Sequence, residues 1–440
     1  MTGQIKTRFA PSPTGFLHVG GIRTALYNYL FAKQHGGKFI LRIEDTDRAR
    51  LVEGAEENIV GTLKDFGLDF DEGPNRQSEN LEKYKKLAEE LVSKGLAYAD
   101  EGAIRFKMPN EGTIEFTDII RGKIEIENKL QEDFVILKSD GYPTYNLAHL
   151  VDDHETGVTH VIRGEEFISS MPKYIALHRA FGWELPQYAH LPLLLNSKRA
   201  KLSKREGDVA VKDFLEQGYL KEAIINFVAL LGWHPSQSDR ELFSLEDLIK
   251  EFRLEDVQKA GAVFDLQKLD WMNGEYIRKT SPRKILELVR PNNKYIDDQL
   301  DDMIKNKPAF LSDEKIEQII ALEQPRLKKL SEIGDKIDFF FRTPEYDKEL
   351  LRWKTMTDDE IKKSLNSAIQ ILQEVSEKNF TKEELEKLLL KKAEEIGDRG
   401  TLLWPLRTAL SGKKASPGPF EIMDILGKEE TLLRLNKALL

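Results

Sequence analysis

Residues 11–21 read PSPTGFLHVGG. Two prolines and three glycines within eleven residues oppose both helix and strand, so this stretch predicts a loop. The short apolar segment before it, residues 5–10, leads into a proline and is typical of a strand. After the loop, apolar residues recur at three- and four-residue spacing over 22–35, which predicts an amphipathic helix ending near Gly36 and Gly37.

The run KFILRIE at residues 38–44 predicts a second buried strand. Strand, loop, helix and strand within about forty residues form a βαβ unit, and such units build parallel sheets. The loop therefore lies at the carboxyl end of the first strand and at a helix N-terminus. Ligands bind at that edge of α/β folds, and the N–H groups of a helix N-terminus favour phosphate. Gly15, Gly20 and Gly21 let a ligand approach the backbone closely.

The pattern of expected helices and strands changes twice in the remainder of the chain. A helix is predicted over 80–94, and a mostly β insert follows it, with short strands at 103–108, 124–126 and 134–137. Another parallel strand and its helix are predicted at 159–163 and 171–181. Beyond about residue 215 the pattern is largely helical, including an amphipathic helix over 382–395. The fold class we expect is an α/β N-terminal half, Rossmann-like with a short β insert, followed by an all-α half.

Bulk composition narrows the class of protein. At 440 residues the chain predicts several domains, and it has no apolar run of about 18 residues, so we expect no membrane span. Its N-terminus lacks an apolar signal core, and zero cysteines exclude disulfides and thiolate zinc sites. We therefore expect a cytoplasmic protein. The net charge of −9 argues against a generic nucleic-acid coating protein but leaves RNA binding through local basic patches.

Two segments suit phosphate chemistry. A lone loop histidine such as His18 is more often structural, but this one precedes the glycine pair at the predicted phosphate-binding helix start. The run NSKRAKLSKREG (196–207) holds five basic residues against one acid. Alone it would be a solvated turn. Together with the first loop, it predicts a segment that neutralises a polyphosphate.

Two further segments suit an amino-acid ligand. Glu44 closes the second strand in LRIEDTD (41–47), where its carboxylate could bind an ammonium group, whereas the following aspartates fit a helix cap. In GYPTYNLAHLVDDHETGVTHVIRGEEF (141–167), Arg163 stands at a strand end and could pair with a carboxylate. Tyr145 and His149 are candidate pocket residues. No further residues with metal spacing accompany Asp152, Asp153 and His154, so no metal site is predicted there.

In this order the segments resemble a bacterial-type glutamyl-tRNA synthetase, a class I aminoacyl-tRNA synthetase. RFAPSPTGFLHVGG (8–21) is similar to the His-Ile-Gly-His signature of that family, and KLSKR (201–205) to its Lys-Met-Ser-Lys-Ser signature. RIEDTD, YPTYNLAHLVDDH, VIRGEEF and KLDWMNGEYIR (268–278) are similar to further family segments, and the resemblance runs from residue 7 to the C-terminus.

The resemblance implies a two-step reaction. Glutamate and ATP, accompanied by Mg²⁺, give glutamyl-adenylate and pyrophosphate, and the terminal adenosine of tRNA(Glu) then takes the glutamyl group. Charging of tRNA(Gln) as well is left open, and a monomer is the family expectation. The implied catalytic residues are His18, Lys201 and Lys204. The implied ATP-binding residues are His18, Gly20, Gly21, Glu166, Leu194 and Lys204. The implied glutamate-binding residues are Arg8, Ala10, Ser12, Glu44, Tyr145, His149 and Arg163.

The resemblance also implies a division of the chain into five parts: a Rossmann catalytic domain in two halves (1–98 and 142–213), a shortened connective insert (99–141), a stem-contact helical domain (214–285) and an α-helical anticodon-binding domain (286–440). Three departures stand out. The insert lacks the cysteine-rich zinc segment of many relatives, His149 replaces an asparagine of some relatives, and Leu202 and Arg205 alter the second signature.

Three other functions compete with this interpretation. A catalytically silent tRNA-binding paralogue is disfavoured by intact His18, Lys204, Glu44 and Arg163. An enzyme that glutamylates a modified tRNA base and lacks an anticodon domain is disfavoured by the helical half after residue 286. An unrelated α/β nucleotidyltransferase would leave that long helical half unexplained.

Overall fold

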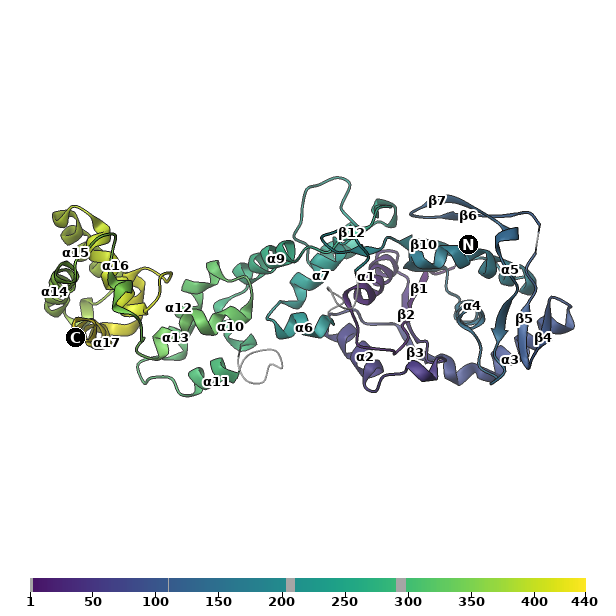
Figure 1. The fold of residues 1–440 in the computed structure, drawn as a ribbon, viewed down its shortest axis with the longest axis horizontal. Coiled ribbons are helices and arrows are strands. Elements are labelled where there is room, and N and C mark those ends of the chain that lie inside the picture. Colours follow the sequence, from purple (N-terminus) through teal and green to yellow (C-terminus); the bar gives the residue numbers. More distant parts are fainter. Residues whose placement is uncertain (1–2, 110, 203–209, 290–297) are drawn as a thin grey trace. The chain divides into compact units, whose positions relative to one another are not determined.

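The computed structural model describes residues 3–109, 111–202, 210–289 and 298–440. Its contacts divide the chain into two compact units. The first comprises Met1–Leu215 and Lys221–Met272, and the second comprises Glu216–Leu220 and Asn273–Leu440. Every strand among the described residues falls in the first unit, and the second is helical (Figure 1). The α/β half followed by an all-α half is therefore confirmed.

The first unit begins with the predicted βαβ arrangement. Its first sheet has the order β1-β2-β3 with all pairs parallel, and Arg8 lies opposite Ile40. Its elements are β1 (Lys6–Phe9), α1 (Val19–Gln34), β2 (Lys38–Ile43), α2 (Ala55–Asp65) and β3 (Glu72–Arg76). Helix α1 starts three residues before the apolar periodicity predicts. The reason is that the side chain of His18 caps its first turn.

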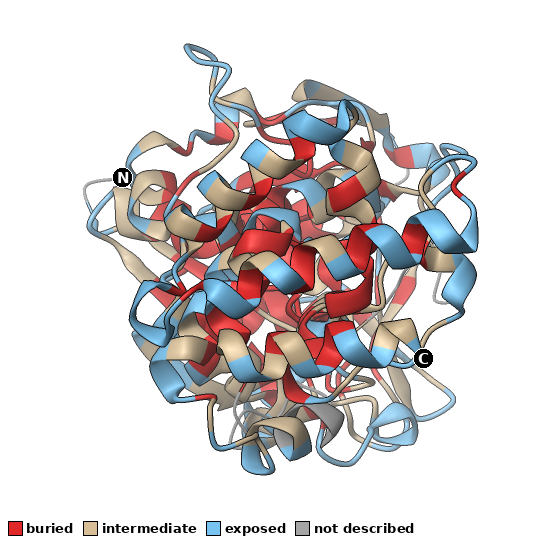
Figure 2. Cartoon of the chain, turned by 90° about the vertical axis from the view of Figure 1, so that its left-hand side faces the viewer, coloured by how far each residue is buried: buried red, intermediate tan, exposed pale blue. Residues whose placement is uncertain are grey.

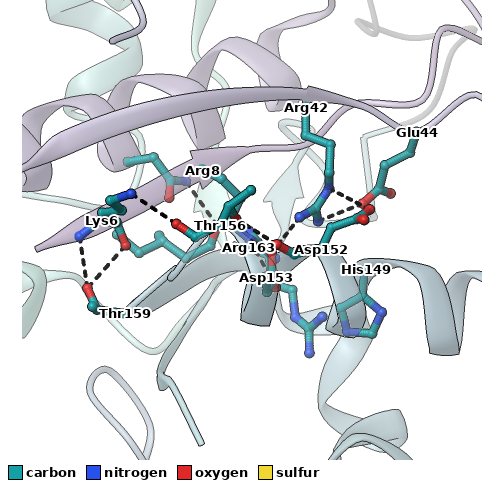
Figure 3. Close-up of polar contacts among 12 residues, drawn as sticks. Lys6, Arg8, Arg42, Glu44, His149, Asp152, Asp153, Thr156, Thr159 and Arg163 are labelled. Carbon is teal, nitrogen blue, oxygen red and sulfur yellow. Dashed lines mark hydrogen bonds and ion pairs between the residues drawn. The ribbon is translucent and has the colours of Figure 1, made fainter. Parts of the chain in front are cut away.

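A second set of parallel strands continues this layer. Strand β10 pairs in parallel with both β9 and β6, and β7 closes the edge as the antiparallel partner of β6. The N–H of Thr159 donates to the carbonyl of Lys6 at 3.0 Å, which joins the start of β9 to β1 (Figure 3 shows these two residues). The carboxyl ends of β1, β2 and β9 therefore share one edge. The elements are β6 (Thr113–Asp118), β7 (Gly122–Glu127), β9 (His160–Gly164), α5 (Met171–Phe181) and β10 (Gln187–Leu191).

The connective insert and its flanking helices pack as one core. An antiparallel sheet of order β4-β5-β8 packs with buried side chains of α3 and α4, such as Tyr84 and Leu147. Strand β6 alternates exposed and buried residues, so Ile114 and Phe116 reach the same core. The elements are α3 (Leu81–Ser93), β4 (Ala97–Asp100), β5 (Ala103–Phe106), β8 (Phe134–Leu137) and α4 (Tyr145–Glu155).

After β10, the chain continues in short helices and strands. Strands β11 and β12 form a parallel pair. The chain passes from one unit to the other inside α6, after Leu215, returns after Leu220, and passes again inside α9, after Met272. The elements are β11 (Leu194–Leu195), α6 (Val211–Glu216), α7 (Lys221–Ala229), α8 (Leu245–Glu251), β12 (Ala262–Val263) and α9 (Leu266–Lys279).

The second unit is built from amphipathic helices. Buried and exposed residues alternate along single helices (Figure 2), as in α15, where Leu385, Leu389 and Ala393 are buried. The amphipathic helix predicted over 382–395 is thus present. The elements are α10 (Pro282–Leu288), α11 (Asp298–Lys305), α12 (Asp313–Glu323), α13 (Ile333–Phe341), α14 (Asp358–Glu374), α15 (Lys382–Ile396), α16 (Arg399–Ser411) and α17 (Pro419–Leu439).

One buried cation joins three of these helices. The guanidinium of Arg434 in α17 donates to the carbonyls of Phe339 in α13 and Leu410 in α16, at 2.5 and 3.0 Å.

None of the described helices is both long and apolar enough to cross a membrane. The five-part division predicted from the sequence is finer than the two units and stays a prediction.

Candidate active site

A cleft of about 1030 Å³ opens at the carboxyl edge of the parallel sheet in the first unit. That volume is at the upper end of the range for small-molecule sites, so it can hold a nucleotide together with an amino acid. The predicted site residues that line it are Arg8, Ala10, Ser12, His18, Gly20, Gly21, Glu44, Tyr145, Arg163, Glu166, Leu194 and Lys201. Lys204 lies outside the described residues.

His18 is the N-cap of α1. Its Nδ1 accepts hydrogen bonds from the backbone N–H groups of Gly20 and Gly21, at 3.1 and 3.3 Å. These two N–H groups, expected to face phosphate, are thus directed at the imidazole. Because Nδ1 accepts, the proton of a neutral ring resides on Nε2. A Cβ on Gly20 would lie 3.1 Å from the ring, so glycine lets the ring pack against the helix start.

Part of the basic run 196–207 lies at this cleft. Lys201 and Leu202 line it, and the N–H of Leu202 donates to the carbonyl of Leu194 at 2.9 Å. On the other side of the gap in the described residues, Ala210 forms a β-bridge with His18. The chain thus lies at the cleft just before this gap and contacts the first loop just after it.

Buried charged side chains form a cluster (Figure 3), and two of them, Arg8 and Glu44, line the cleft. Arg42 on β2 forms ion pairs with Glu44 at 3.0 Å and with Asp153 on α4 at 2.6 Å, and its Nε lies 3.8 Å from Asp152. Arg8 on β1 donates from Nε to Asp153 at 3.1 Å. All five side chains are at most 7 % exposed. Such burial is sustainable only because each charge has partners.

The cluster sets the charge states of its acids. Burial favours the protonated form, but Arg8 and Arg42 hold the pKa of Asp153 well below its usual range. Burial raises the pKa of Glu44, and its ion pair with Arg42 opposes that rise. Two guanidinium groups thus face three carboxylates, Asp152 included. With all groups ionised, one negative charge is in excess, and an ammonium ligand at Glu44 would balance it.

Arg163, at the end of β9, has different surroundings. Its guanidinium carbon lies 4.7 Å from the ring centre of Tyr174 and 4.8 Å from that of Phe167. It donates to the hydroxyl of Tyr145 at 3.3 Å. No ion pair among the described residues includes Arg163, although it is only 4 % exposed. A buried cation that lines a cleft without an acidic partner is suited to bind an anionic ligand.

His149 differs from the other candidates because it is not among the lining residues. Its ring stacks on Tyr145 at 4.5 Å and meets the edge of Tyr174. Burial holds its pKa well below 6.5, and Arg163 adds to that effect. The imidazole is therefore neutral and supports Tyr145 from behind. Its direct contact with glutamate stays a prediction.

The sequence Asp152-Asp153-His154 forms no metal cluster. The two aspartates are the partners of arginines, and Asp152 also accepts from Tyr84 and Gln77, at 2.7 and 2.8 Å. The ring of His154 stacks on Trp183 at 3.9 Å. Across the part of the chain that the structure describes, no group of three or more His, Cys, Asp or Glu residues is arranged to hold a metal ion.

Sequence reasoning missed Arg42, which links Glu44 to α4. A signal was available, because an arginine inside the apolar run KFILRIE must be buried and therefore requires acidic partners. It also missed several residues that line the cleft, for which no local pattern gives a signal: Thr46, Asp47, Arg50, Lys138 and Phe167.

The fold and the cleft agree with what the chain resembles in sequence. A family described as "tRNA synthetases class I (E and Q), catalytic domain" matches residues 4–103 and 100–271, and one described as "Anticodon binding domain" matches 284–439. The chain belongs to the class I tRNA synthetases of the E and Q group.

Within that family, the chain is similar to proteins named glutamate–tRNA ligase. Those of Clostridium botulinum (strain Eklund 17B) and Clostridium tetani are each 42% identical to it, over 99% and 98% of this chain and 98% and 96% of theirs. The crystal structure of a glutamate tRNA ligase from Elizabethkingia meningosepticum in complex with its amino acid matches with a TM-score of 0.88 and 34% identity, covering 99% of both chains. That of the glutamate–tRNA synthetase from Elizabethkingia anophelis gives 0.84 and 35%, covering 99% of this chain and 100% of that one.

Replacing Asp153 by asparagine tests the buried cluster. The substitution leaves Arg8 and Arg42 short of a carboxylate, so we expect a loss of about 3–5 kcal/mol in the free energy of unfolding. Urea unfolding of the full chain measures it. Since the ionised form of Asp153 is the stabilising one, the difference from wild type should shrink only below about pH 4.

The matched control is Glu155→Gln on the same helix. Glu155 forms an exposed ion pair with Lys83 at 3.0 Å, and such pairs contribute little. We expect its urea midpoint to stay near that of wild type. Equal losses in the two variants would show that the cluster is not the stabilising feature.

Proposed function

We propose that the chain is a glutamate–tRNA ligase. It activates L-glutamate with ATP to glutamyl-adenylate and pyrophosphate, and the terminal adenosine of the tRNA then attacks the activated carboxyl to form an ester. One observation carries the proposal: a single cleft is lined by an arginine without an acidic partner, by Glu44 of the buried charge cluster, and by described residues of both signature segments. The full-length similarity to glutamate–tRNA ligases supports it.

The cleft can discriminate the two ends of glutamate. Arg8 and Arg163 hold its carboxylates, with Ser12 and Tyr145 beside them, and Glu44 binds its α-ammonium. The paired, net negative cluster behind Glu44 favours a cation, and the aromatic surroundings of Arg163 favour an anion. Removing one methylene, as in aspartate, changes binding by only ~1–3 kcal/mol, so the charge at the side-chain end must supply much of the selectivity.

The rim of the cleft suits ATP. His18 contacts its phosphates, next to Gly20 and Gly21, while Glu166 and Leu194 touch the nucleotide. Lys201 and Lys204 stabilise the departing pyrophosphate. Mg²⁺ enters with ATP as part of the substrate, bound chiefly through phosphates and water.

Four finer points rest on the sequence alone. Charging of tRNA(Gln) in addition to tRNA(Glu) stays open, since anticodon contacts decide it. A monomer and a cytoplasmic location stay predictions, as does the expectation that no zinc is bound.

Aminoacylation with the two purified tRNAs, tested separately, decides the function. We expect glutamate to be esterified to tRNA(Glu), and ATP–pyrophosphate exchange, measured with and without tRNA, to depend on glutamate. A chain that binds tRNA(Glu) yet shows neither reaction would be a silent paralogue, and the proposal would be wrong.

Arg163→Ala should impair the use of glutamate far more than that of ATP. Loss of a buried partner of a charged ligand costs ~2–5 kcal/mol, so we expect the KM for glutamate to rise by about 30-fold or more. Steady-state exchange assays with each substrate varied in turn measure this. Arg179→Ala is the control, because Arg179 lies exposed on α5 and does not line the cleft. Equal losses for both substrates would contradict a carboxylate site.

Lys204→Ala should reduce ATP–pyrophosphate exchange. Removing one group that stabilises developing charge typically costs about 100- to 1000-fold in rate, whereas tRNA binding loses a single contact at most. Exchange in the presence of tRNA and a filter-binding assay measure the two properties. Lys198→Ala, in the same basic run and exposed, is the matched control and should exchange at nearly the wild-type rate. Unchanged exchange in Lys204→Ala would refute the role of Lys204.

A further inference from the structure

The side chain of Arg163 is held on its inner side by a histidine. Its Nε lies 3.3 Å from Nε2 of His190 on β10, and His190 is completely buried. The two terminal nitrogens lie 3.3 Å from the hydroxyl of Tyr145 and 3.3 Å from the sulfur of Met171. Each guanidinium nitrogen therefore has one neutral partner, which fixes the plane of the group.

The orientation of His190 is fixed in turn by Asp118. The Nδ1 of His190 lies 2.6 Å from Oδ2 of Asp118, which also accepts the backbone N–H of His190 at 3.1 Å. The other oxygen of Asp118 accepts the N–H groups of Ile120 and Arg121, at 3.0 and 2.8 Å. Both the acid and the imidazole have fully buried side chains.

This arrangement determines the tautomer of the histidine. A carboxylate can only accept, so Nδ1 of His190 must carry the proton that Asp118 receives. Nε2 then has a lone pair and accepts from Nε of Arg163. The opposite tautomer, or a doubly protonated ring, would set two N–H groups against each other at 3.3 Å.

We propose that Asp118 and His190 are positioning residues for Arg163, which direct its terminal N–H groups into the cleft to bind the side-chain carboxylate of glutamate. The inference rests on the proposed function, because it assigns Arg163 to that carboxylate. Asp118 ends strand β6, in the insert between the two halves of the sheet. The insert thus supplies a group that shapes the amino-acid pocket without touching the ligand.

Two substitutions of His190 separate positioning from packing. His190→Asn retains an N–H donor near Asp118 but has no atom that reaches Arg163. His190→Gln places an amide oxygen near the former Nε2 and can still accept from Arg163. We expect the KM for glutamate to rise about tenfold or more in His190→Asn and by less than about threefold in His190→Gln, because a hydrogen bond to a charged group is lost only in the first. The kcat and the KM for ATP should change little in both.

A matched control accounts for the loss of a buried imidazole. His178 on α5 is 3 % exposed, lies in the same unit and does not line the cleft. His178→Asn should leave the KM for glutamate unchanged, even where the protein is less stable. Thermal melts of all variants identify any that fail to fold, and His190→Gln then serves as the folded reference.

A double-mutant cycle tests whether His190 acts through Arg163. In the Arg163→Ala background, His190→Asn should add no further increase in the KM for glutamate, because the group it orients is gone. Additive increases would overturn the inference, and so would a wild-type KM in His190→Asn together with a raised KM in Arg163→Ala. If Arg163→Ala itself leaves the KM for glutamate unchanged, the proposed role of Arg163 fails instead.

Discussion

The buried guanidinium of Arg42 is the constraint on which the first unit depends. Taking one ion out of water costs several kcal/mol, so Arg42 can be buried only where carboxylates reach it. Those carboxylates, Asp152 and Asp153, lie on α4, more than one hundred residues along the chain. Asp152 is also bonded to Tyr84 of α3. The same contacts join β2, α4 and α3 and also hold Glu44 and Arg8 at the cleft. The core and the site therefore form together.

The two ends of the cleft differ in how they hold charge. Around Arg42, opposite charges lie within 4 Å of one another, and with all groups ionised one negative charge is in excess. Around Arg163, the partners are neutral: a tyrosine hydroxyl, a thioether and an imidazole. The ion-paired cluster around Arg42 keeps its geometry when no ligand is bound. Arg163, whose partners are neutral, still attracts an anion. The fold thus places a negatively charged end of the cleft after β2 and a positively charged end on β9, the two strands that flank β1.

Periodicity predicts much of this fold, and the misses have physical causes. The elements β1, α1, β2 and α5 follow from apolar spacing, since each buries a regular face. Strand β3 has the sequence EGPNR, which is typical of a turn, and it is a strand only because an edge position tolerates its proline. In the site, the residue types of Glu44 and Arg163 and their places at strand ends predict that they lie in the cleft. The partnership of Asp118 with His190 joins residues 72 positions apart and requires the tertiary structure.

The surroundings of Arg163 also bear on how the proposed site would distinguish glutamate from glutamine, which has nearly the same shape. Three acceptors surround the guanidinium: the Tyr145 oxygen, the Met171 sulfur and Nε2 of His190. Each already accepts a hydrogen from Arg163. A carboxylate needs only donors and finds them, whereas the amide of glutamine brings two N–H donors that need acceptors. A buried donor without a partner costs about 1–3 kcal/mol, in addition to the lost attraction between charges. With Arg163 assigned to the side-chain carboxylate as proposed, the acceptors that it occupies add to the effect of its positive charge in disfavouring glutamine.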